Sequence, residues 1–328
     1  MKRILCILFV LVLLCSCANN TETELSESLP NELEIDTADS EVVIKEPVNK
    51  EQTKIIFIGY KNTFYSNSIY SGIKSVYDGE IICIDIIVEN DYDTLSMRID
   101  EVTSQNDISA IVCPDGASLR YIPQTDIPII VFPQQDETIG VYEDFGADII
   151  IFQPSYMQNN EIAVQIIKQR ECNIVGAIYG AGGPDYKYIY SWEYLKNQLS
   201  GIECVEPVGN AYRIEGLAKE YISDTNCDCL YLLSLPEMSL FAVNDDMYVI
   251  AADSKGKRCV DALIAGKIDC VIQPNYYNMG ELAANAINDI IDGKTVDSKI
   301  ITEPLILQTA QEAQEYISKV EENYPPAS

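Results

Sequence analysis

The sequence predicts an α/β protein with two doubly wound lobes, each built on a parallel sheet. From residue 54 onward, short runs rich in β-branched residues alternate with longer amphipathic runs, which is typical of parallel sheets covered by helices on both faces. Eleven strand-like runs exceed what one open sheet usually holds, so two sheets are favoured. An internal echo supports two related lobes: residues 152–167 and 272–287 agree at six of sixteen positions.

The predicted strands share β-branched or apolar centres and polar, Gly or Pro boundaries. In chain order they are 54–59, 80–88, 108–113, 128–132, 148–152, 173–178, 203–208, 229–233, 247–252, 270–273 and 300–307. Helices are predicted where apolar residues recur at helical spacing. Examples are 67–77, 94–104, 159–170, 187–199 and 280–292. Each half of the echo is a strand end, a Gln-Pro break and an amphipathic helix; chance similarity between two such units is the alternative.

The N-terminus has the form of a secretory signal. Lys2 and Arg3 precede an apolar run, 4–14, that is too short to span a bilayer. The run ends in Leu-Cys-Ser-Cys17, which resembles a bacterial lipobox, although a Cys two residues before the lipidated position is unusual. We expect a lipoprotein signal peptide over 1–16 and lipidation of Cys17. A plain signal peptide is the alternative.

Residues 17–53 are predicted to be a disordered acidic tether. Residues 18–53 contain ten acidic residues, two Lys and hardly any long apolar run. Such a segment buries too little apolar surface to offset its ordering entropy, and its like charges favour extension. The tether would hold a folded body, beginning near Lys54, away from a membrane surface.

Charge and composition exclude several classes of function. The chain has 51 Asp and Glu against 22 Lys and Arg, a net charge of −29, which opposes nucleic-acid binding. It has no His, so Ser-His-Asp catalysis, Cys-His catalysis and His-ligated metal sites are excluded. No G-x-S-x-G motif occurs. We therefore expect no enzyme, no cofactor and no metal.

Eight of the eleven Cys lie beyond the signal and lipobox. They are Cys83, Cys113, Cys172, Cys204, Cys227, Cys229, Cys259 and Cys270. Several fall in apolar strand-like runs, where Cys acts as a small hydrophobic residue. Cys227-Asp228-Cys229 is either a metal or redox pair or, as we favour, two strand residues on opposite faces. Export permits disulfides, but the sequence does not give their connectivity.

One stretch resembles a known family. Residues 248–280, YVIAADSKGKRCVDALIAGKIDCVIQPNYYNMG, resemble the type I periplasmic sugar-binding proteins, the ribose- and galactose-type receptors of ABC transporters, which are related to the effector domains of lactose-repressor-like regulators. Residues 62–65 (NTFY), 108–115 (ISAIVCPD) and 127–131 (IPIIV) look like further landmarks of that family. The resemblance covers about residues 54–307.

The resemblance implies two lobes joined by three hinge crossovers, near 152–155, 273–275 and 303–304. The N-terminal lobe would comprise 54–152 and 275–303, and the C-terminal lobe 153–274 and 304–328. The ligand would lie between the lobes, outside the carboxyl ends of the strands, and would be captured by lobe closure.

The resemblance also implies the ligand contacts. Asp253 matches the family's strand-end Asp, with a helix cap as the alternative. Phe64 and Tyr65 match stacking aromatic residues, with core packing as the alternative. The other candidates are Asp115, Gln134, Tyr188, Gln273 and Asn275. The family's second Asp aligns with Pro133 and its Arg falls near Tyr188, so the predicted pocket is neutral and rich in amide and tyrosine groups.

The leading prediction is an extracytoplasmic, lipid-anchored receptor that is monomeric. It would bind a small neutral ligand, with a sugar in first place, and deliver it to an ABC permease in the bacterial cell membrane. Gly180–Asp185 is similar to a region of basic-membrane-protein-type nucleoside receptors, which makes a nucleoside the rival ligand. A ligand-sensing subunit of a membrane kinase is a further alternative.

Overall fold

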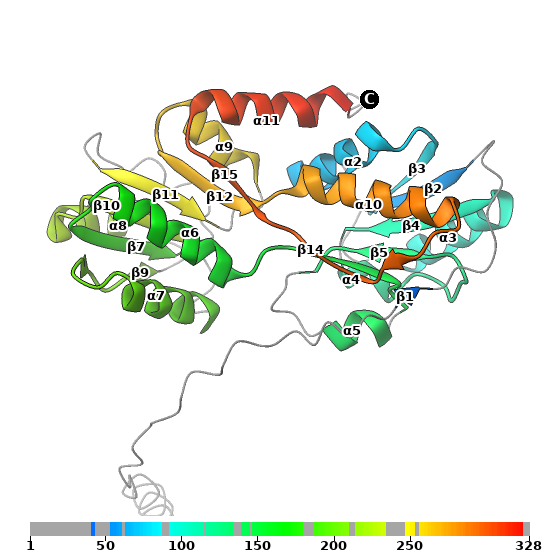
Figure 1. Ribbon diagram of the computed structural model, residues 1–328, viewed down its shortest axis with the longest axis horizontal. Helices are drawn as coiled ribbons and strands as arrows, with labels where there is room; N and C mark the ends of the chain where they lie inside the picture. Colours follow the sequence, from blue (N-terminus) through cyan, green and yellow to red (C-terminus); the bar gives the residue numbers. More distant parts are fainter. Residues whose placement is uncertain are drawn as a thin grey trace, which may run out of the picture. The chain divides into compact units, whose positions relative to one another are not determined.

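The computed structural model describes eleven segments of the chain (Figure 1). They are 41–42, 53–60, 63–86, 92–114, 116–133, 139–144, 146–179, 186–209, 214–233, 247–252 and 256–323. The predicted signal peptide, Cys17 and most of the predicted tether lie outside these segments. No helix among the described segments combines the length and the apolar character needed to cross a membrane.

The first sheet has six strands in the order β14-β6-β5-β4-β2-β3, and all of its pairs are parallel. Its strands are β2 (Lys54–Gly59), β3 (Glu80–Asp85), β4 (Ile108–Cys113), β5 (Ile129–Val131), β6 (Ile149–Phe152) and β14 (Lys299–Ile301). Its associated helices are α2 (Phe64–Val76), α3 (Tyr92–Gln105), α4 (Gly116–Leu119), α5 (Ile139–Asp144) and α10 (Tyr276–Ile291).

Alternation along β2 shows how this sheet is buried on both faces. Ile55 and Phe57 pack into the cluster formed with α2 and α10, whereas Ile56 and Ile58 pack into the cluster formed with α3. All four side chains are buried. Four successive buried apolar residues, 55–58, suit a strand of a parallel sheet covered on both faces.

The second sheet has seven strands in the order β15-β12-β11-β10-β7-β8, and β9 also pairs with β7. Its strands are β7 (Ile174–Tyr179), β8 (Glu203–Cys204), β9 (Val208–Gly209), β10 (Cys229–Leu233), β11 (Tyr248–Ala252), β12 (Cys270–Pro274) and β15 (Pro304–Leu307). The pairs are parallel except β12–β15. Its helices are α6 (Tyr156–Gln169), α7 (Tyr186–Gln198), α8 (Ile214–Thr225), α9 (Lys257–Ile264) and α11 (Ala310–Asn323).

The chain passes between the two sheets three times. It leaves the first sheet after β6, returns after β12 and leaves again between β14 and β15. The predicted two-sheet α/β fold with three crossovers is confirmed. The prediction of one strand over 300–307 is wrong: β14 and β15 belong to different sheets. At this break Thr302 Oγ1 donates to the Phe152 carbonyl over 2.6 Å, which joins the first and third crossings.

The predicted strand 203–208 is also divided, and a tyrosine explains the division. The Tyr221 hydroxyl accepts from the Ala177 N–H (3.1 Å) and donates to the Val205 carbonyl (3.4 Å). The phenol therefore takes backbone partners that a continuous strand beside β7 would use. Gly176 leaves room for the ring, because a Cβ there would meet it at 3.0 Å.

Three residues of the predicted tether, Glu41, Val42 and Thr53, are part of the described structure. β1 (Glu41–Val42) pairs antiparallel with β13 (Val296–Asp297), which follows α10. The expected disorder of residues 17–53 does not extend to this pair. The backbone pairing places residues 41–42 next to β13, which directly precedes β14 in the chain.

A buried polar network ties α6 to its neighbours. The Asn160 side-chain oxygen accepts from Ser191 Oγ (2.9 Å) and Tyr231 Oη (2.8 Å), while its amide donates to the Ser191 carbonyl (3.1 Å). All three residues are buried. The network therefore fixes α6 against α7 and β10 with satisfied hydrogen bonds.

Asn160→Ala is expected to lower the free energy of unfolding by about 2–4 kcal/mol, because it leaves the Tyr231 and Ser191 hydroxyls buried without this partner. Chemical denaturation followed by Trp192 fluorescence measures the change, since Trp192 is 1% exposed and reports loss of the core. Gln165→Ala, on the exposed face of the same helix, is the control. Equal stability of the two variants would contradict the network's role.

Candidate ligand-binding site

The candidate site lies where the strands of both sheets end. Ligands of open parallel sheets bind outside the carboxyl ends of the strands. Tyr60, Pro114, Phe132 and Gln153 follow β2, β4, β5 and β6 in the first sheet, and Gln273 lies near the end of β12 in the second. The segments that begin at residues 61, 87, 115, 134, 180, 210, 234 and 253 continue from strand ends and lie outside the described residues.

The turn after β2 positions the two predicted aromatic contacts. Thr63 is the N-cap of α2: its hydroxyl accepts from the Ser66 N–H (3.3 Å) and donates to the Tyr60 carbonyl (3.2 Å). Ser66 Oγ in turn accepts from the Tyr60 N–H (3.2 Å). These bonds fix the start of α2 directly after the strand end, so Phe64 and Tyr65 are held in its first turn.

Tyr65 is engaged within the first lobe. Its hydroxyl donates to the Pro114 carbonyl at the end of β4 over 2.5 Å. Its ring packs edge-to-face on Tyr276 at the start of α10, with centroids 4.7 Å apart. Tyr65 therefore links the end of β4 to the start of α10, at the second crossover. These contacts give it a structural role in addition to the predicted role in ligand binding.

Phe64 packs in the other direction. Its ring meets Tyr316 of α11 edge-on, with centroids 6.0 Å apart, and it lies against the apolar cluster of the second sheet. The structure thus places Phe64 in a packed core, which was the alternative to the predicted stacking on a ligand. This contact packs α2, a helix of the first sheet, against α11, the C-terminal helix.

The echoed Gln-Pro breaks place a buried Gln at two crossovers. The Gln153 amide donates to the Phe132 carbonyl (2.9 Å), and its side-chain oxygen has no hydrogen-bond partner among the described residues. Gln273 is 0% exposed, and neither of its amide atoms has such a partner. Sequence reasoning missed Gln153, although the repeat contained it.

Gln273 lies beside a buried tyrosine. The Tyr316 hydroxyl approaches Gln273, Ser68 and the Tyr277 backbone, but it forms no hydrogen bond of regular geometry. Burial raises the pKa of Tyr316 to about 12, so it stays neutral. In this arrangement Gln273 faces a protein interior that joins α2, β12 and α11.

Asn275 caps α10. Its side-chain oxygen accepts from the Asn278 N–H (3.1 Å), the arrangement of an N-cap. Asn275 also lines a pocket of about 280 Å³ between α10, β15 and α11. Glu281, Glu312, Glu315 and Lys319 make this pocket polar.

The remaining predicted contacts cannot be placed from side chains. Asp115, Gln134 and Asp253 lie outside the described residues. Tyr188 belongs to α7, but its side chain is outside the described part. Among the described residues, no group of three or more Cys, Asp or Glu is arranged to hold a metal ion.

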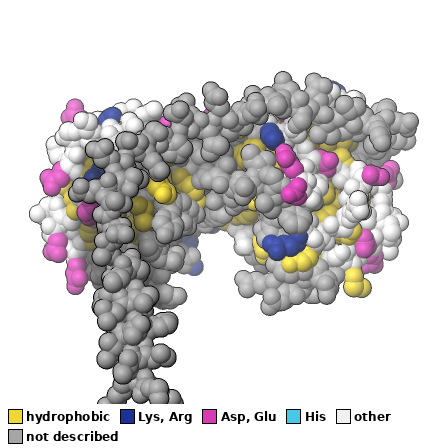
Figure 2. Space-filling view, turned by 90° about the horizontal axis from the view of Figure 1, so that it is seen from below, with side chains coloured by type: hydrophobic (Ala, Val, Ile, Leu, Met, Phe, Trp, Pro, Cys, Tyr) yellow, Lys and Arg dark blue, Asp and Glu magenta, His cyan; other side chains and the backbone are white. Residues whose placement is uncertain are grey.

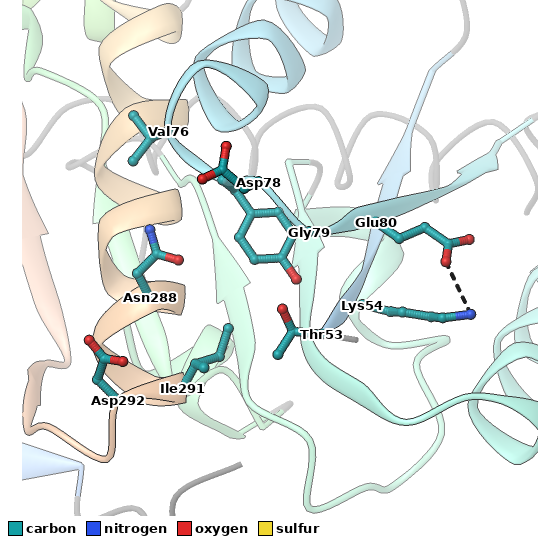
Figure 3. Close-up of a pocket in the computed structure, with 10 residues that line it drawn as sticks. Thr53, Lys54, Val76, Asp78, Gly79, Glu80, Asn288, Ile291 and Asp292 are labelled. Carbon is teal, nitrogen blue, oxygen red and sulfur yellow. Dashed lines mark ion pairs between the residues drawn. The ribbon is translucent and has the colours of Figure 1, made fainter. Parts of the chain in front are cut away.

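A larger pocket, of about 760 Å³, lies at the opposite ends of the strands (Figure 3). Its lining includes Lys54 and Glu80 at the starts of β2 and β3, and Asp292 after α10. Lys54 pairs with Glu80 over 3.1 Å, the dashed line in Figure 3. Helix carboxyl termini and acidic side chains make this end negative, and it lies far along the strands from their carboxyl ends. It is not the predicted ligand site.

The visible described surface carries scattered charges rather than one basic patch. In Figure 2, Asp and Glu side chains are spread over the surface, with a few Lys and Arg among them. This distribution agrees with the net charge of −29.

No protein-family model matches the chain, and no curated protein matches it. Solved structures do match. The sugar-binding protein of a sugar ABC transporter from Bacillus halodurans aligns with TM-score 0.63 and 14% identity, covering 81% of this chain and 99% of that one. The periplasmic ribose ABC transporter protein from Conexibacter woesei aligns with TM-score 0.59 and 14% identity, covering 84% and 97%.

A third match holds a ligand. The ABC transporter periplasmic solute-binding protein from Actinobacillus succinogenes, solved with bound D-allose, aligns with TM-score 0.59 and 12% identity, covering 81% of this chain and 100% of that one. Each alignment covers more than four-fifths of this chain and nearly the whole length of the matched structure. The chain therefore has the fold of the type I periplasmic sugar-binding proteins.

Proposed function

We propose that this protein is an extracytoplasmic solute-binding lipoprotein that captures a small neutral sugar between its lobes and presents it to an ABC permease. The observation that carries the proposal is the pair of sheets linked by three crossovers, which sets the carboxyl ends of two sets of parallel strands beside the same crossings. Structural neighbours with this arrangement are described as sugar-binding proteins of ABC transporters.

The proposed contacts are those that the sequence resemblance selects and whose side chains lie outside the described part of the structure. Tyr65, Phe64 and Asn275 bond or pack within the protein, and Gln273 is fully buried. Asp253, directly after β11, matches the strand-end Asp of the similar family and is our first candidate for a carboxylate that accepts from sugar hydroxyls. Asp115, Gln134 and Tyr188 complete the set. Their chemistry suits a polyhydroxylated, uncharged ligand.

The N-terminal part of the proposal rests on the sequence. The basic start, the short apolar run and the lipobox-like Cys17 support export and lipid anchoring. Mass spectrometry of the membrane fraction should find the mature chain beginning at a diacylated Cys17. An unmodified N-terminus at another residue would contradict the anchor and leave the ligand proposal standing.

A thermal-shift screen of the full chain tests ligand capture. Pentoses and hexoses, including D-allose, D-arabinose and D-ribose, are compared with nucleosides. A sugar at 100 times its dissociation constant adds about 2.7 kcal/mol to the native state and should raise Tm by several degrees. A shift with nucleosides alone would move the protein to the nucleoside-receptor alternative, and no shift across the panel would contradict capture of either.

For a sugar that binds, Asp253→Ala should weaken affinity at least tenfold without lowering the Tm of the free protein. Asp261→Ala, an exposed carboxylate on α9, is the matched control and should bind normally. Isothermal titration calorimetry separates the two. Equal affinity of both variants would remove Asp253 from the site.

A further inference from the structure

Two cysteines at the amino end of the second sheet lie together. Cys172 joins α6 to β7, and Cys229 is the first residue of β10, the strand next to β7. Both pack into the same apolar cluster; Cys172 is 8% exposed and Cys229 is 0% exposed. Their thiols lie close enough for each to shift the pKa of the other. The six other cysteines among the described residues, like these two, are free thiols.

The backbone brings this pair together by two devices. Glu171 ends α6 in the left-handed region, at φ +55°, so the chain folds back and the Cys172 N–H donates to the Ile167 carbonyl (3.4 Å). The Asp228 carboxylate, one residue before Cys229, accepts from the N–H of Asn173 (2.8 Å) and of Ile174 (2.9 Å), the two residues after Cys172. The residues beside both cysteines are thus bonded directly to each other.

We propose that Cys172 and Cys229 are a reversible redox pair that closes an intramolecular disulfide by exchange with a small external disulfide. The inference is independent of the proposed function. In the sequence Cys227 and Cys229 form a Cys-x-Cys pattern, but the structure places their side chains on opposite faces of the sheet. Cys227 packs into the cluster on the opposite face of the sheet, where its thiol donates to the Met247 sulfur over 3.5 Å.

The two thiols have different chemical roles. The neighbouring Cys229 thiol lowers the pKa of Cys172, which favours Cys172 as the attacking thiolate. The Cys172 thiol, together with burial, raises the pKa of Cys229 well above its ordinary value, so Cys229 is the resolving thiol. Cys172 is also the more exposed of the two, so an external reagent reaches it first.

The exchange balances in two steps. The Cys172 thiolate attacks one sulfur of the external disulfide and releases one thiolate, which leaves a mixed disulfide on Cys172. Cys229 then loses its proton to solvent or to that released thiolate, attacks the Cys172 sulfur and releases the second thiol. The two protein thiols are oxidised by two electrons, and the external disulfide is reduced to two thiols.

The cross-link would stabilise the second lobe without changing the affinity for a ligand. It closes a long loop that holds β8, β9 and α8, which restricts the unfolded chain. Both cysteines lie at the amino ends of their strands, away from the carboxyl ends where the ligand is proposed. Oxidation should therefore raise Tm by about 5 °C or more without changing the affinity of any sugar that binds.

Peptide mapping tests the pair in the full chain. The reduced protein is incubated with oxidised glutathione about 10 °C below its Tm, alkylated and digested with trypsin. A cross-link between the peptide 171–187 and the peptide 220–255 is expected. Because the second peptide contains both Cys227 and Cys229, Cys227→Ser is the matched control. The cross-link should persist in Cys227→Ser and disappear in Cys229→Ser and Cys172→Ser.

Three results would overturn the proposal. They are no cross-linked peptide in the wild-type chain, a cross-link that survives in Cys229→Ser, and a fall in Tm on oxidation. Reduced and oxidised wild-type protein provide the Tm comparison without any substitution, so a variant that folds poorly does not decide the outcome.

Discussion

Gly72→Ala and Gly280→Ala are each expected to lower the free energy of unfolding by about 3 kcal/mol. Gly72 lies in α2 and Gly280 in α10, and these helices run side by side over the first sheet (Figure 1). A Cβ on Gly72 would collide with the Tyr277 carbonyl oxygen, and a Cβ on Gly280 would collide with the Ile69 carbonyl oxygen. Backbone atoms cannot turn aside as a side chain can, so the helices must separate.

The separation would spread to the second crossover, because α10 begins there. Tyr276 and Met279, both fully buried, pack beside this contact in the core of the first sheet. The usual gain in helix propensity from Gly to Ala, about 1 kcal/mol, is smaller than the expected loss. Urea denaturation followed by circular dichroism measures the difference.

Gly256→Ala is the matched control for these substitutions. Gly256 precedes α9 at an ordinary negative φ of −111°, and a Cβ there would approach nothing closer than 3.9 Å. Its stability should change by less than about 0.5 kcal/mol. If all three variants were equally stable, the close α2–α10 approach would be wrong.

Tyr316→Ala is expected to lower the free energy of unfolding by about 3–5 kcal/mol, the range of large aromatic truncations in cores. Tyr316 is 6% exposed, stacks edge-on against Phe64 of α2 and belongs to the core cluster of the second sheet. α11 also bonds to α2 through Ser71, whose hydroxyl donates to the Val320 carbonyl. The ring therefore fills the contact through which the C-terminal helix joins elements of both sheets.

Tyr316→Phe separates the ring from its hydroxyl. Because the buried hydroxyl has no regular hydrogen bond, its removal should cost less than about 1 kcal/mol. Thermal and urea denaturation of the three proteins give the comparison. A Phe variant as unstable as the Ala variant would mean that the hydroxyl makes a strong bond with Gln273 or Ser68.

The strand pattern was predictable because parallel strands buried on both faces contain nearly continuous apolar runs. β2, β4 and β10 begin and end where the sequence predicts. The two divided strands were not predictable in the same way. The run 300–307 is uniformly strand-like, and only the presence of two sheets decides that β14 joins one and β15 the other. The gap between β8 and β9 depends on Tyr221, which comes from a helix later in the chain.

The same distinction between local sequence and tertiary contacts applies to the candidate site. The sequence resemblance selected residues at strand ends, and the structure places Tyr65, Gln273 and Asn275 at or beside the ends of β4 and β12. Which of these side chains faces outward is a tertiary matter. Asn275 is a helix cap, and Gln273 lies against Tyr316, a residue some forty positions later that no local pattern connects to it.

The sequence by itself determined most of the strands, several of the helices, the two-lobe fold, the lack of His and the excess of negative charge. These properties depend on composition and on local periodicity, which each segment carries within itself. Only the tertiary structure decided that Cys172 meets Cys229 rather than Cys227, that Gly72 and Gly280 let two helices touch, and that α11 packs on α2. Such contacts join residues far apart in the chain, and their free energy exists only when the packed fold brings the two partners together.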